Sequence, residues 1–303
     1  MQLSILRSDR IYRKIASSPE DAREDIYRYE LMKPFEYKYA VVGIPLKAET
    51  PGGYDVIMAA SMSGEYEPRK ITKELLPVID QLSNDSLWNT CEGSLRETMD
   101  EFLTHGIELK TQDYLFTLLL SDPANPMTAF TGDCCGDGGI PGYIVGTIIP
   151  KETSITQMPV VLAHEMNHNI RWQYCQWSNQ VTLADLIVSE GLAETYEATR
   201  FGEKMLGQWA TALSKEEVLT KVNPLLYPHL SETNFQIISS YLYGNGIMSL
   251  RGGASIGVPD YAGYTCGYYL IQHYLQKTGA SIYEATITPT QEILAKTTDF
   301  WTK

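Results

Sequence analysis

Apolar residues near the N-terminus recur at helical spacing in one segment and form extended runs in the next. Residues 11–32 carry Ile, Ala and Tyr side chains among charged ones, which predicts one or two short helices around Pro19. Residues 37–46 and 54–62 are rich in Val, Ala and Tyr, with a turn-forming sequence between them at 49–53. This pattern predicts two extended segments joined by a turn.

The middle of the chain combines helical and strand-like patterns. Residues 75–107 show helical periodicity with a break at 83–86, and Gly106 is typical of the C-terminal end of a helix. Short apolar runs at 114–120 and 143–149 predict buried strands, and the glycine-rich stretch between them predicts a turn or a lid. The rest of the chain is almost wholly helical in pattern. Strands followed by helices predict an α+β fold.

Residues 164–168 read His-Glu-Met-Asn-His, which is the HExxH pattern. Thr156 is suited to cap a helix here, and Pro159 would then fall in its first turn, where the missing N–H costs little. Side chains four residues apart on a helix are offset by only about 40°, so both imidazoles can reach one metal ion. We therefore predict His164 and His168 as zinc ligands.

A catalytic zinc site needs a third protein ligand, and the following segment offers Glu190 and Glu194. The third histidine of a longer form of the motif is replaced by Tyr174, so the ligand must come from elsewhere. A capping-box start at Thr182 predicts a helix on which both glutamates face inward. We predict that Glu190 is the ligand and that Glu194 accepts the spare N–H of a ligand histidine. We also expect Gly191 to let this helix approach the HExxH helix closely.

This set of residues predicts hydrolysis by activated water. Three protein ligands leave one zinc position open for water, and Glu165 lies where it can act as the general base. A further hydrogen-bond donor to the developing oxyanion is expected. The candidates for this donor are Tyr264, Tyr268, His229, His273 and Arg251.

Charge and composition argue against several other classes of protein. The 303 residues include 24 Lys and Arg against 37 Asp and Glu, a formal net charge of −13 that disfavours binding to nucleic acid or to an anionic membrane surface. The N-terminus lacks the apolar core of a signal peptide, and no run is long enough to span a membrane. The 5 cysteines do not form the dense framework of a secreted disulfide scaffold. We expect a cytoplasmic protein that binds a peptide or protein substrate, without nucleic-acid or membrane partners.

Two alternatives remain open. Cys134 or Cys135, in the acidic glycine-rich stretch, would provide a thiolate ligand in place of Glu190, as in deformylases that hold zinc by one Cys and two His. Such a site favours hydrolysis of non-peptide amides. The second alternative is a catalytically silent binding protein stabilised by zinc, in which a fourth protein ligand closes the site.

The HExxH, EGLAE, GGIPGY and AGYTCGYYLIQHYL motifs together resemble the YjaZ-type family of predicted zinc-dependent proteases, and the similarity extends over residues 11–293. The order of the ligands is also similar to the wider gluzincin class. The resemblance implies a zincin-like fold with a small mixed sheet and a helical lobe. It also implies one zinc ion and a set of site residues, namely ligands His164, His168 and Glu190, base Glu165, supporting Glu194 and oxyanion donor Tyr264.

The resemblance also implies how a peptide is bound. In gluzincins the strand just before the active helix binds the substrate backbone by strand addition. That strand falls here on residues 143–147, so the resemblance assigns substrate contacts to Tyr143, Ile144 and Val145.

The expected organisation is a single bilobed domain over residues 1–303. An N-terminal α/β lobe is expected over about 1–155 and a helical lobe over about 156–303, with the active site between them. The predicted function is that of a zinc metallopeptidase, a hydrolase that cleaves peptide bonds with metal-activated water and a Glu general base.

Overall fold

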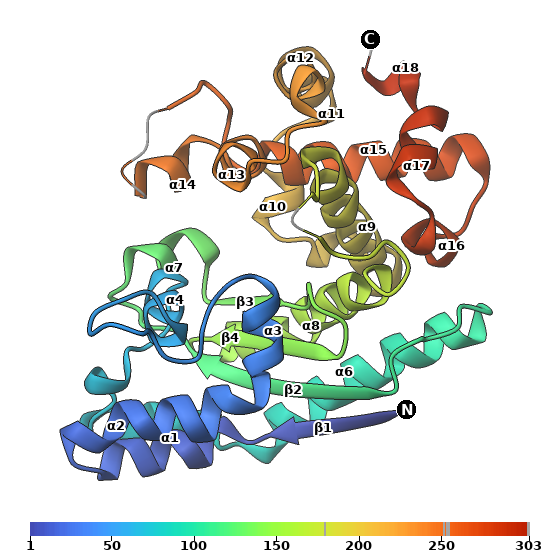
Figure 1. The fold of residues 1–303 in the computed structure, drawn as a ribbon. Helices are drawn as coiled ribbons and strands as arrows, with labels where there is room; N and C mark the ends of the chain where they lie inside the picture. The colour runs from blue at the N-terminus through green and yellow to red at the C-terminus, as the bar shows by residue number, and fades with distance from the viewer. Residues whose placement is uncertain (179, 251, 253–254, 302–303) are drawn as a thin grey trace. The chain divides into compact units, whose positions relative to one another are not determined.

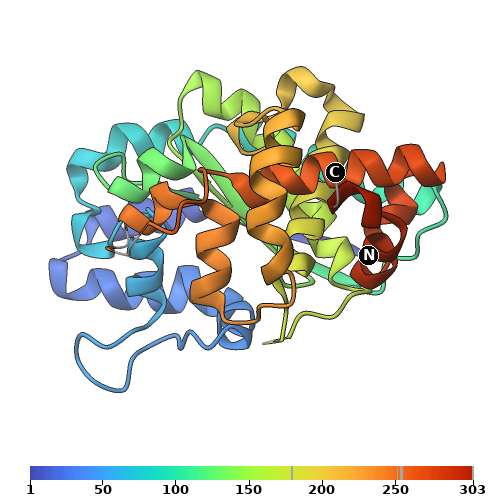
Figure 2. The ribbon, with the colours of Figure 1, turned by 90° about the horizontal axis from the view of Figure 1, so that it is seen from above.

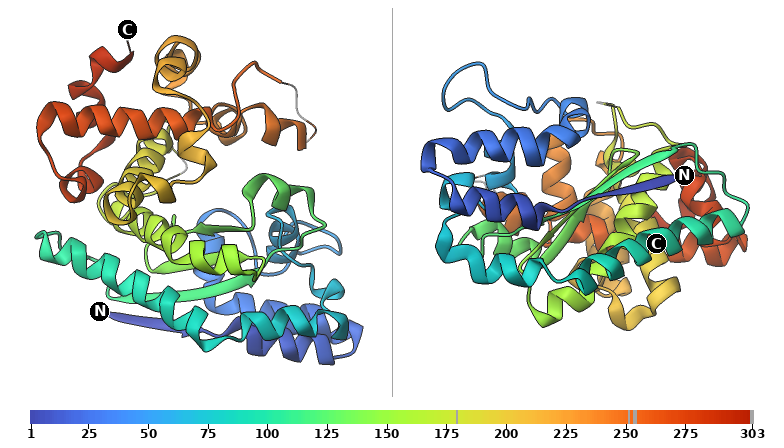
Figure 3. Two further views of the ribbon diagram at one scale, coloured as in Figure 1. Left: turned by 180° about the vertical axis from the view of Figure 1, so that it is seen from behind. Right: turned by 90° about the horizontal axis from the view of Figure 1, so that it is seen from below.

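Four short strands form one mixed sheet in the order β1-β2-β4-β3. The computed structural model describes residues 1–178, 180–250, 252 and 255–301. Its strands are β1 (Gln2–Leu6), β2 (Asp113–Leu120), β3 (Cys134–Asp137) and β4 (Tyr143–Ile148) (Figure 1). β2 runs parallel to both β1 and β4, whereas β3 pairs with β4 antiparallel. The parallel course of β1 beside β2 is visible in the right panel of Figure 3.

The described chain divides into two compact units. The first contains Met1–Glu97 and Thr111–Leu162, and the second contains Thr98–Lys110 and Ala163–Lys303. The whole sheet lies in the first unit. The division falls inside the helix that carries the HExxH sequence.

Helices make up most of the rest of both units. The helices that begin in the first unit are α1 (Ser8–Ser17), α2 (Glu20–Ile26), α3 (Glu36–Val41), α4 (Val56–Met62), α5 (Leu76–Leu82), α6 (Asp85–Thr104), α7 (Pro126–Thr131) and α8 (Glu152–Arg171). Those of the second unit are α9 (Leu183–Phe201), α10 (Gln208–Thr211), α11 (Lys215–Glu217), α12 (Asn223–Leu226), α13 (Phe235–Tyr243), α14 (Asn245–Leu250), α15 (Ala262–Thr278), α16 (Ile282–Ile287), α17 (Thr290–Lys296) and α18 (Thr298–Trp301). An α+β arrangement with a small mixed sheet is therefore confirmed.

Two segments expected to be extended, residues 37–46 and 54–62, contain helices instead. Residues 37–41 of the first lie in α3 and residues 56–62 of the second lie in α4, whereas residues 42–46 are neither helix nor strand. The side chain of Asp55 caps α4 by accepting hydrogen bonds from the backbone N–H groups of Ile57 and Met58. Asp55 is itself held by Arg28 at 2.9 Å, a partner from a distant part of the chain. The Val- and Ala-rich composition thus favoured a strand less strongly than the Asp55 cap favours a helix. The geometry of this cap depends on the tertiary contact with Arg28.

The helix α8 begins earlier than its sequence suggested. It starts at Glu152, so Thr156 does not cap it and Pro159 lies inside the helix. The hydroxyl of Ser154 organises this start, because it accepts a hydrogen bond from the backbone N–H of Lys151 and donates one to the carbonyl of Ile149. Pro159 costs the helix one internal hydrogen bond, which a long and buried helix tolerates.

The first part of α8 lies directly on the sheet. At Gly146 in β4, an added Cβ would come within 2.8 Å of Leu118 Cδ2 and 3.0 Å of Met158 Sδ. Glycine therefore permits this close approach of the strand to the helix. The core around it is apolar, and Ile144, Ile148 and Leu162 have no exposed surface. This packing fixes the segment that leads into the HExxH residues.

The second unit is organised around α9 and α15, which cross one another (Figures 1 and 2). The predicted capping box at the start of α9 is confirmed, with Thr182 and Asp185 exchanging side-chain and backbone hydrogen bonds. Within the described residues, no helix combines the length and the apolar character that a membrane crossing requires.

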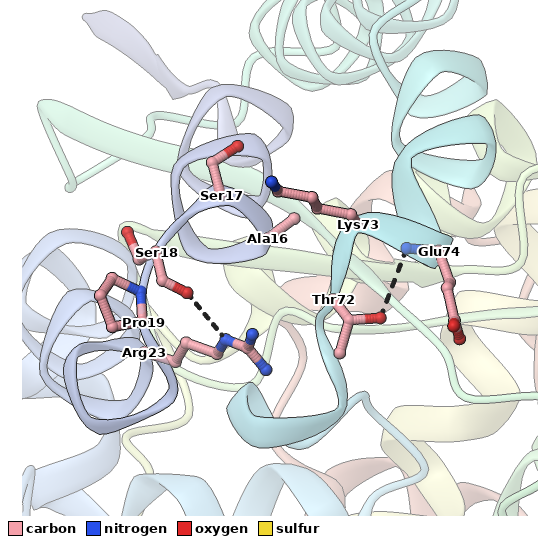
Figure 4. A pocket seen from close by; sticks show the side chains of 8 residues that line it. All are labelled: Ala16, Ser17, Ser18, Pro19, Arg23, Thr72, Lys73 and Glu74. Atoms are coloured by element: carbon pink, nitrogen blue, oxygen red, sulfur yellow. Dashed lines mark hydrogen bonds between the residues drawn. The ribbon is translucent and has the colours of Figure 1, made fainter.

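The first unit also has a small surface hollow between α1, α2 and the turn before α5 (Figure 4). Its polar groups serve the local fold. Arg23 donates to the carbonyl of Ser18 just beyond α1, and Thr72 accepts from the backbone N–H of Glu74. We assign no binding role to this hollow.

Candidate metal centre

The second half of α8 presents two histidines and a glutamate within the second unit. His164, Glu165 and His168 are 9%, 7% and 7% exposed, so all three are buried among apolar neighbours. Burial of three ionisable groups on one helix is costly unless partners compensate their charge and hydrogen-bonding needs. The partners of the two histidines come from α9.

Three ligand atoms converge between α8 and α9. Glu190 Oε2 lies 3.3 Å from His164 Nε2 and 3.2 Å from His168 Nε2, and the two Nε2 atoms are 2.9 Å apart. Tetrahedral ligands at zinc-binding distances of about 2.0–2.1 Å stand roughly 3.4 Å from one another. The triangle is thus close to the size that one zinc ion requires, and it is built from the three residues predicted as ligands.

The hydrogen bonds on the far sides of the imidazole rings favour a cation at the centre. His164 Nδ1 lies 2.8 Å from Glu197 Oε1, so this nitrogen carries a proton and donates it to the carboxylate. His168 Nδ1 lies 2.9 Å from Ser189 Oγ. A neutral imidazole that donates through Nδ1 has only a lone pair at Nε2. In that form, the lone pairs of the two Nε2 atoms and the carboxylate oxygen of Glu190 repel one another. A cation between these three atoms removes the repulsion, so the donor set fits a divalent metal.

The pKa values of Glu190 and His164 in the metal-free protein are also shifted in the directions that favour positive charge at the centre. Burial opposes ionisation of Glu190, but the charge of His168 and the hydrogen bonds from both histidines lower its pKa to about 2. Burial alone would lower the pKa of His164, but its hydrogen bonds to Glu190 and Glu197 raise it well above the ordinary value. The centre therefore keeps Glu190 ionised and attracts either a proton or a metal ion.

The structure assigns the supporting carboxylate differently from the sequence. Glu197, rather than Glu194, accepts the hydrogen bond from His164. Glu194 is 3% exposed and its Oε2 has no hydrogen-bond partner, and burial followed by the charge of Glu197 raises its pKa well above the ordinary value. Glu190, Glu194 and Glu197 share one face of α9 at spacings of four and three, so extending the stripe by one step would have found Glu197.

The close approach predicted for Gly191 occurs with a different helix. A Cβ on Gly191 would lie 2.1 Å from the carbonyl oxygen of Gly267, and one on Gly267 would lie 2.2 Å from that of Ile187. The glycine thus brings α9 against α15 rather than against α8. The candidate metal ligands on α8 and α9 meet through the length of their side chains instead.

Among the described oxyanion-donor candidates, Tyr264 is the one whose pKa is affected by the charges of Glu190 and Glu165. Burial raises its pKa, and the charge of Glu190, a hydrogen bond with Tyr243 and the charge of Glu165 raise it further, so its hydroxyl stays protonated. His229 stacks on Tyr241 with ring centroids 4.4 Å apart, and His273 bonds Asp299 at 3.1 Å. Tyr268 interacts most strongly with Glu203 among the charged groups, and Arg251 lies outside the described residues.

The expected substrate-binding strand is not the edge of the sheet. β4 lies between β2 and β3, and Val145 pairs with Thr117 on one side and with Asp137 on the other. Backbone groups paired on both sides cannot accept a further strand. Val145 therefore does not fit the assignment of strand addition, whereas Tyr143 and Ile144 lie outside the β3–β4 register, and their assignment stays a prediction. The edge strand beside β4 is β3, within the glycine-rich stretch that was expected to be a turn or a lid.

Comparison with known proteins places these features in a family. Residues 87–295 match the family described as "Predicted Zn-dependent protease (DUF2268)". The "Uncharacterized protein YjfC" of Bacillus subtilis (strain 168) is 32% identical over 297 residues, which cover 98% of each chain. The "Uncharacterized protein YjaZ" of the same organism is 26% identical over 148 residues, or 48% of this chain and 53% of the relative. No solved structure shows significant similarity.

These matches confirm the resemblance read from the sequence motifs. The family match includes all three convergent ligand residues, Glu165 and Glu197. The alignment with YjfC extends over almost the entire chain. The chain therefore belongs to the family of predicted Zn-dependent proteases.

Proposed function

We propose that this protein is a zinc-dependent peptidase of the gluzincin type. One zinc ion would be held by His164, His168 and Glu190, with its fourth position open to water. The observation that carries the proposal is the meeting of two histidine Nε2 atoms and a carboxylate oxygen at 2.9–3.3 Å. Zinc bound there would act as a Lewis acid that polarises a carbonyl group and makes water more acidic.

The residues of the chain then divide the proton transfers between them. Glu165 accepts a proton from the attacking water and passes it to the nitrogen of the leaving amine. Tyr264 keeps its proton and donates a hydrogen bond to the carbonyl oxygen as that oxygen gains negative charge. Glu197 and Ser189 hold the ligand histidines in orientation.

The donor set disfavours the two alternatives raised by the sequence. Glu190 provides the third ligand atom, so a thiolate from Cys134 or Cys135 is not needed to complete the site. Among the described residues, no fourth His, Cys, Asp or Glu joins the group of His164, His168 and Glu190, which is the arrangement of an open site rather than a closed one.

The decisive experiment is the Glu165→Gln variant. Because Glu165 is not a ligand, the variant should retain one zinc per chain by elemental analysis, as the wild type does. It should lose peptidase activity by about 100-fold or more, since the amide cannot accept the proton. Full activity with zinc bound would refute the mechanism, and absence of zinc from the wild type after purification in zinc would refute the site.

A further inference from the structure

Four half-buried aromatic side chains gather near the metal centre, and we call them the aromatic wall. They are Trp209 in α10, Tyr243 in α13, and Tyr261 and Tyr264 at the start of α15. The Trp209 ring lies in the middle, with its centroid 4.6 Å from Tyr261, 4.8 Å from Tyr264 and 6.4 Å from Tyr243. Three separate segments of the second unit thus bring their aromatic residues to one place.

Tyr264 connects the aromatic wall to the metal centre. Burial, the charge of Glu190 and a hydrogen bond with Tyr243 raise the pKa of its hydroxyl, in keeping with a position near the site carboxylates. The helix contact gives the same result, since Gly191 directly follows Glu190 and touches Gly267, one turn beyond Tyr264. The wall therefore begins on the helix that touches α9 directly beside Glu190.

The aromatic wall is held rigidly and at a conformational cost. Tyr261 has a φ of 61°, and it is the one described non-glycine residue in the left-handed region. Its backbone N–H donates to the carbonyl of Tyr243 at 2.9 Å, and the Thr265 hydroxyl donates to the carbonyl of Trp209 at 2.9 Å. Strained backbone of this kind is concentrated at binding and catalytic sites, where the surrounding structure maintains it.

We propose that the aromatic wall binds an aromatic side chain of a peptide substrate, next to the bond that is cleaved. The inference rests on the proposed peptidase function and specifies its substrate class. Half-buried rings offer edges and faces to another ring, which aromatic pairs prefer in tilted or edge-to-face geometry.

The test measures binding separately from cleavage. The zinc-loaded Glu165→Gln protein is titrated by calorimetry with two peptides that differ only in Phe or Ala at one position, and the position is moved along the peptide. At one position the Phe peptide should bind about ten-fold more tightly, as expected for a well-packed buried ring. Adding Trp209→Ala should bring this ratio close to one.

Two further variants separate recognition from misfolding. Tyr261→Gly removes a ring of the wall and suits the left-handed backbone, so it should fold and also reduce the Phe preference. Tyr227→Ala removes an exposed ring that instead contacts Trp301, and it should leave the preference unchanged. Circular dichroism and zinc content confirm that each variant is folded and loaded.

The outcomes distinguish this inference from the proposed function. An unchanged Phe preference in both wall variants, or a stronger preference for Lys than for Phe, would overturn the inference. If the wild-type protein cleaves none of the peptides while the Phe preference still depends on Trp209, the aromatic subsite is supported and the peptidase proposal fails. If the wild-type protein cleaves the peptides without any preference for Phe, the peptidase proposal is supported and the aromatic subsite is refuted.

Discussion

The two ligand histidines are held by partners of different charge. His164 donates to the carboxylate of Glu197, whereas His168 meets the hydroxyl of Ser189. A carboxylate behind a ligand histidine fixes its tautomer and makes it a stronger donor to the metal than a neutral hydroxyl does. The affinity for the metal ion should therefore depend on Glu197, although Glu197 is not itself one of the three predicted ligands.

At the scale of single residues, we predict that Glu197→Gln weakens zinc binding by about ten-fold or more. Competition with a chromophoric chelator measures this affinity directly. Glu194→Gln is the matched control, because Glu194 lies on the same helix, is equally buried and does not bond to His164. Its effect should be clearly smaller. If Glu194→Gln weakened binding more, the assignment made from the sequence pattern would be the correct one.

The contact between α9 and α15 matters most at the scale of secondary structure. Gly191 and Gly267 face one another so closely that the helix backbones touch without intervening side chains. This contact sets the position of Glu190, which adjoins Gly191, relative to Tyr264 on α15. The contact between the two glycines thus fixes the distance between Glu190, the proposed metal ligand on α9, and Tyr264, the residue of the aromatic wall on α15.

We predict that Gly191→Ala lowers the free energy of unfolding by at least about 2 kcal/mol or prevents folding, because the new methyl group would overlap backbone atoms. Urea unfolding followed by circular dichroism tests this. Gly93→Ala in α6 is the matched control, since its Cβ would meet nothing within 4 Å. That change should raise stability by about 0.5–1 kcal/mol, as expected for alanine inside a helix. Equal stability of the two variants would contradict the close approach.

At the scale of the whole molecule, the pH dependence of stability should reflect a buried carboxyl group in the first unit. Glu65 is 7% exposed and accepts a hydrogen bond from the Tyr27 hydroxyl at 3.2 Å. Burial raises its pKa to about 8, against smaller effects of Tyr27 and Lys38 in the other direction. The remaining ionisable groups that interact with it are Tyr12, Tyr39 and Asp137.

The sign of the effect follows from comparing the two states. Between the ordinary pKa of 4.5 and about 8, Glu65 keeps its proton in the folded protein and loses it in the unfolded chain. Raising the pH through this window therefore lowers the free energy of unfolding, by up to about 1.4 kcal/mol per pH unit for one proton.

We predict that Glu65→Gln, which stays neutral, removes this part of the pH dependence. The measurement is urea unfolding of both proteins at several pH values within the window. The difference in unfolding free energy between them should grow in favour of the variant as the pH rises. A difference that does not change with pH would show that Glu65 is ionised in the folded state.

Local sequence determined the elements that carry the chemistry. HExxH needs only a helix to bring His164 and His168 to one side, and the capping box at Thr182 depends on residues three apart. The strands at Asp113–Leu120 and Tyr143–Ile148 were evident because apolar residues fill them almost completely. Such signals act over a few residues of chain, so they can be read without knowledge of the fold.

Only the tertiary structure decided which residues meet across the chain. The selection of Glu197 over Glu194 depends on the angle at which α9 faces α8, and the partner of Gly191 depends on where α15 crosses. The edge position of β3 follows from strand order, which a short, half-exposed strand does not reveal. Residues far apart in sequence are brought together by packing, and no local pattern records their distance or orientation.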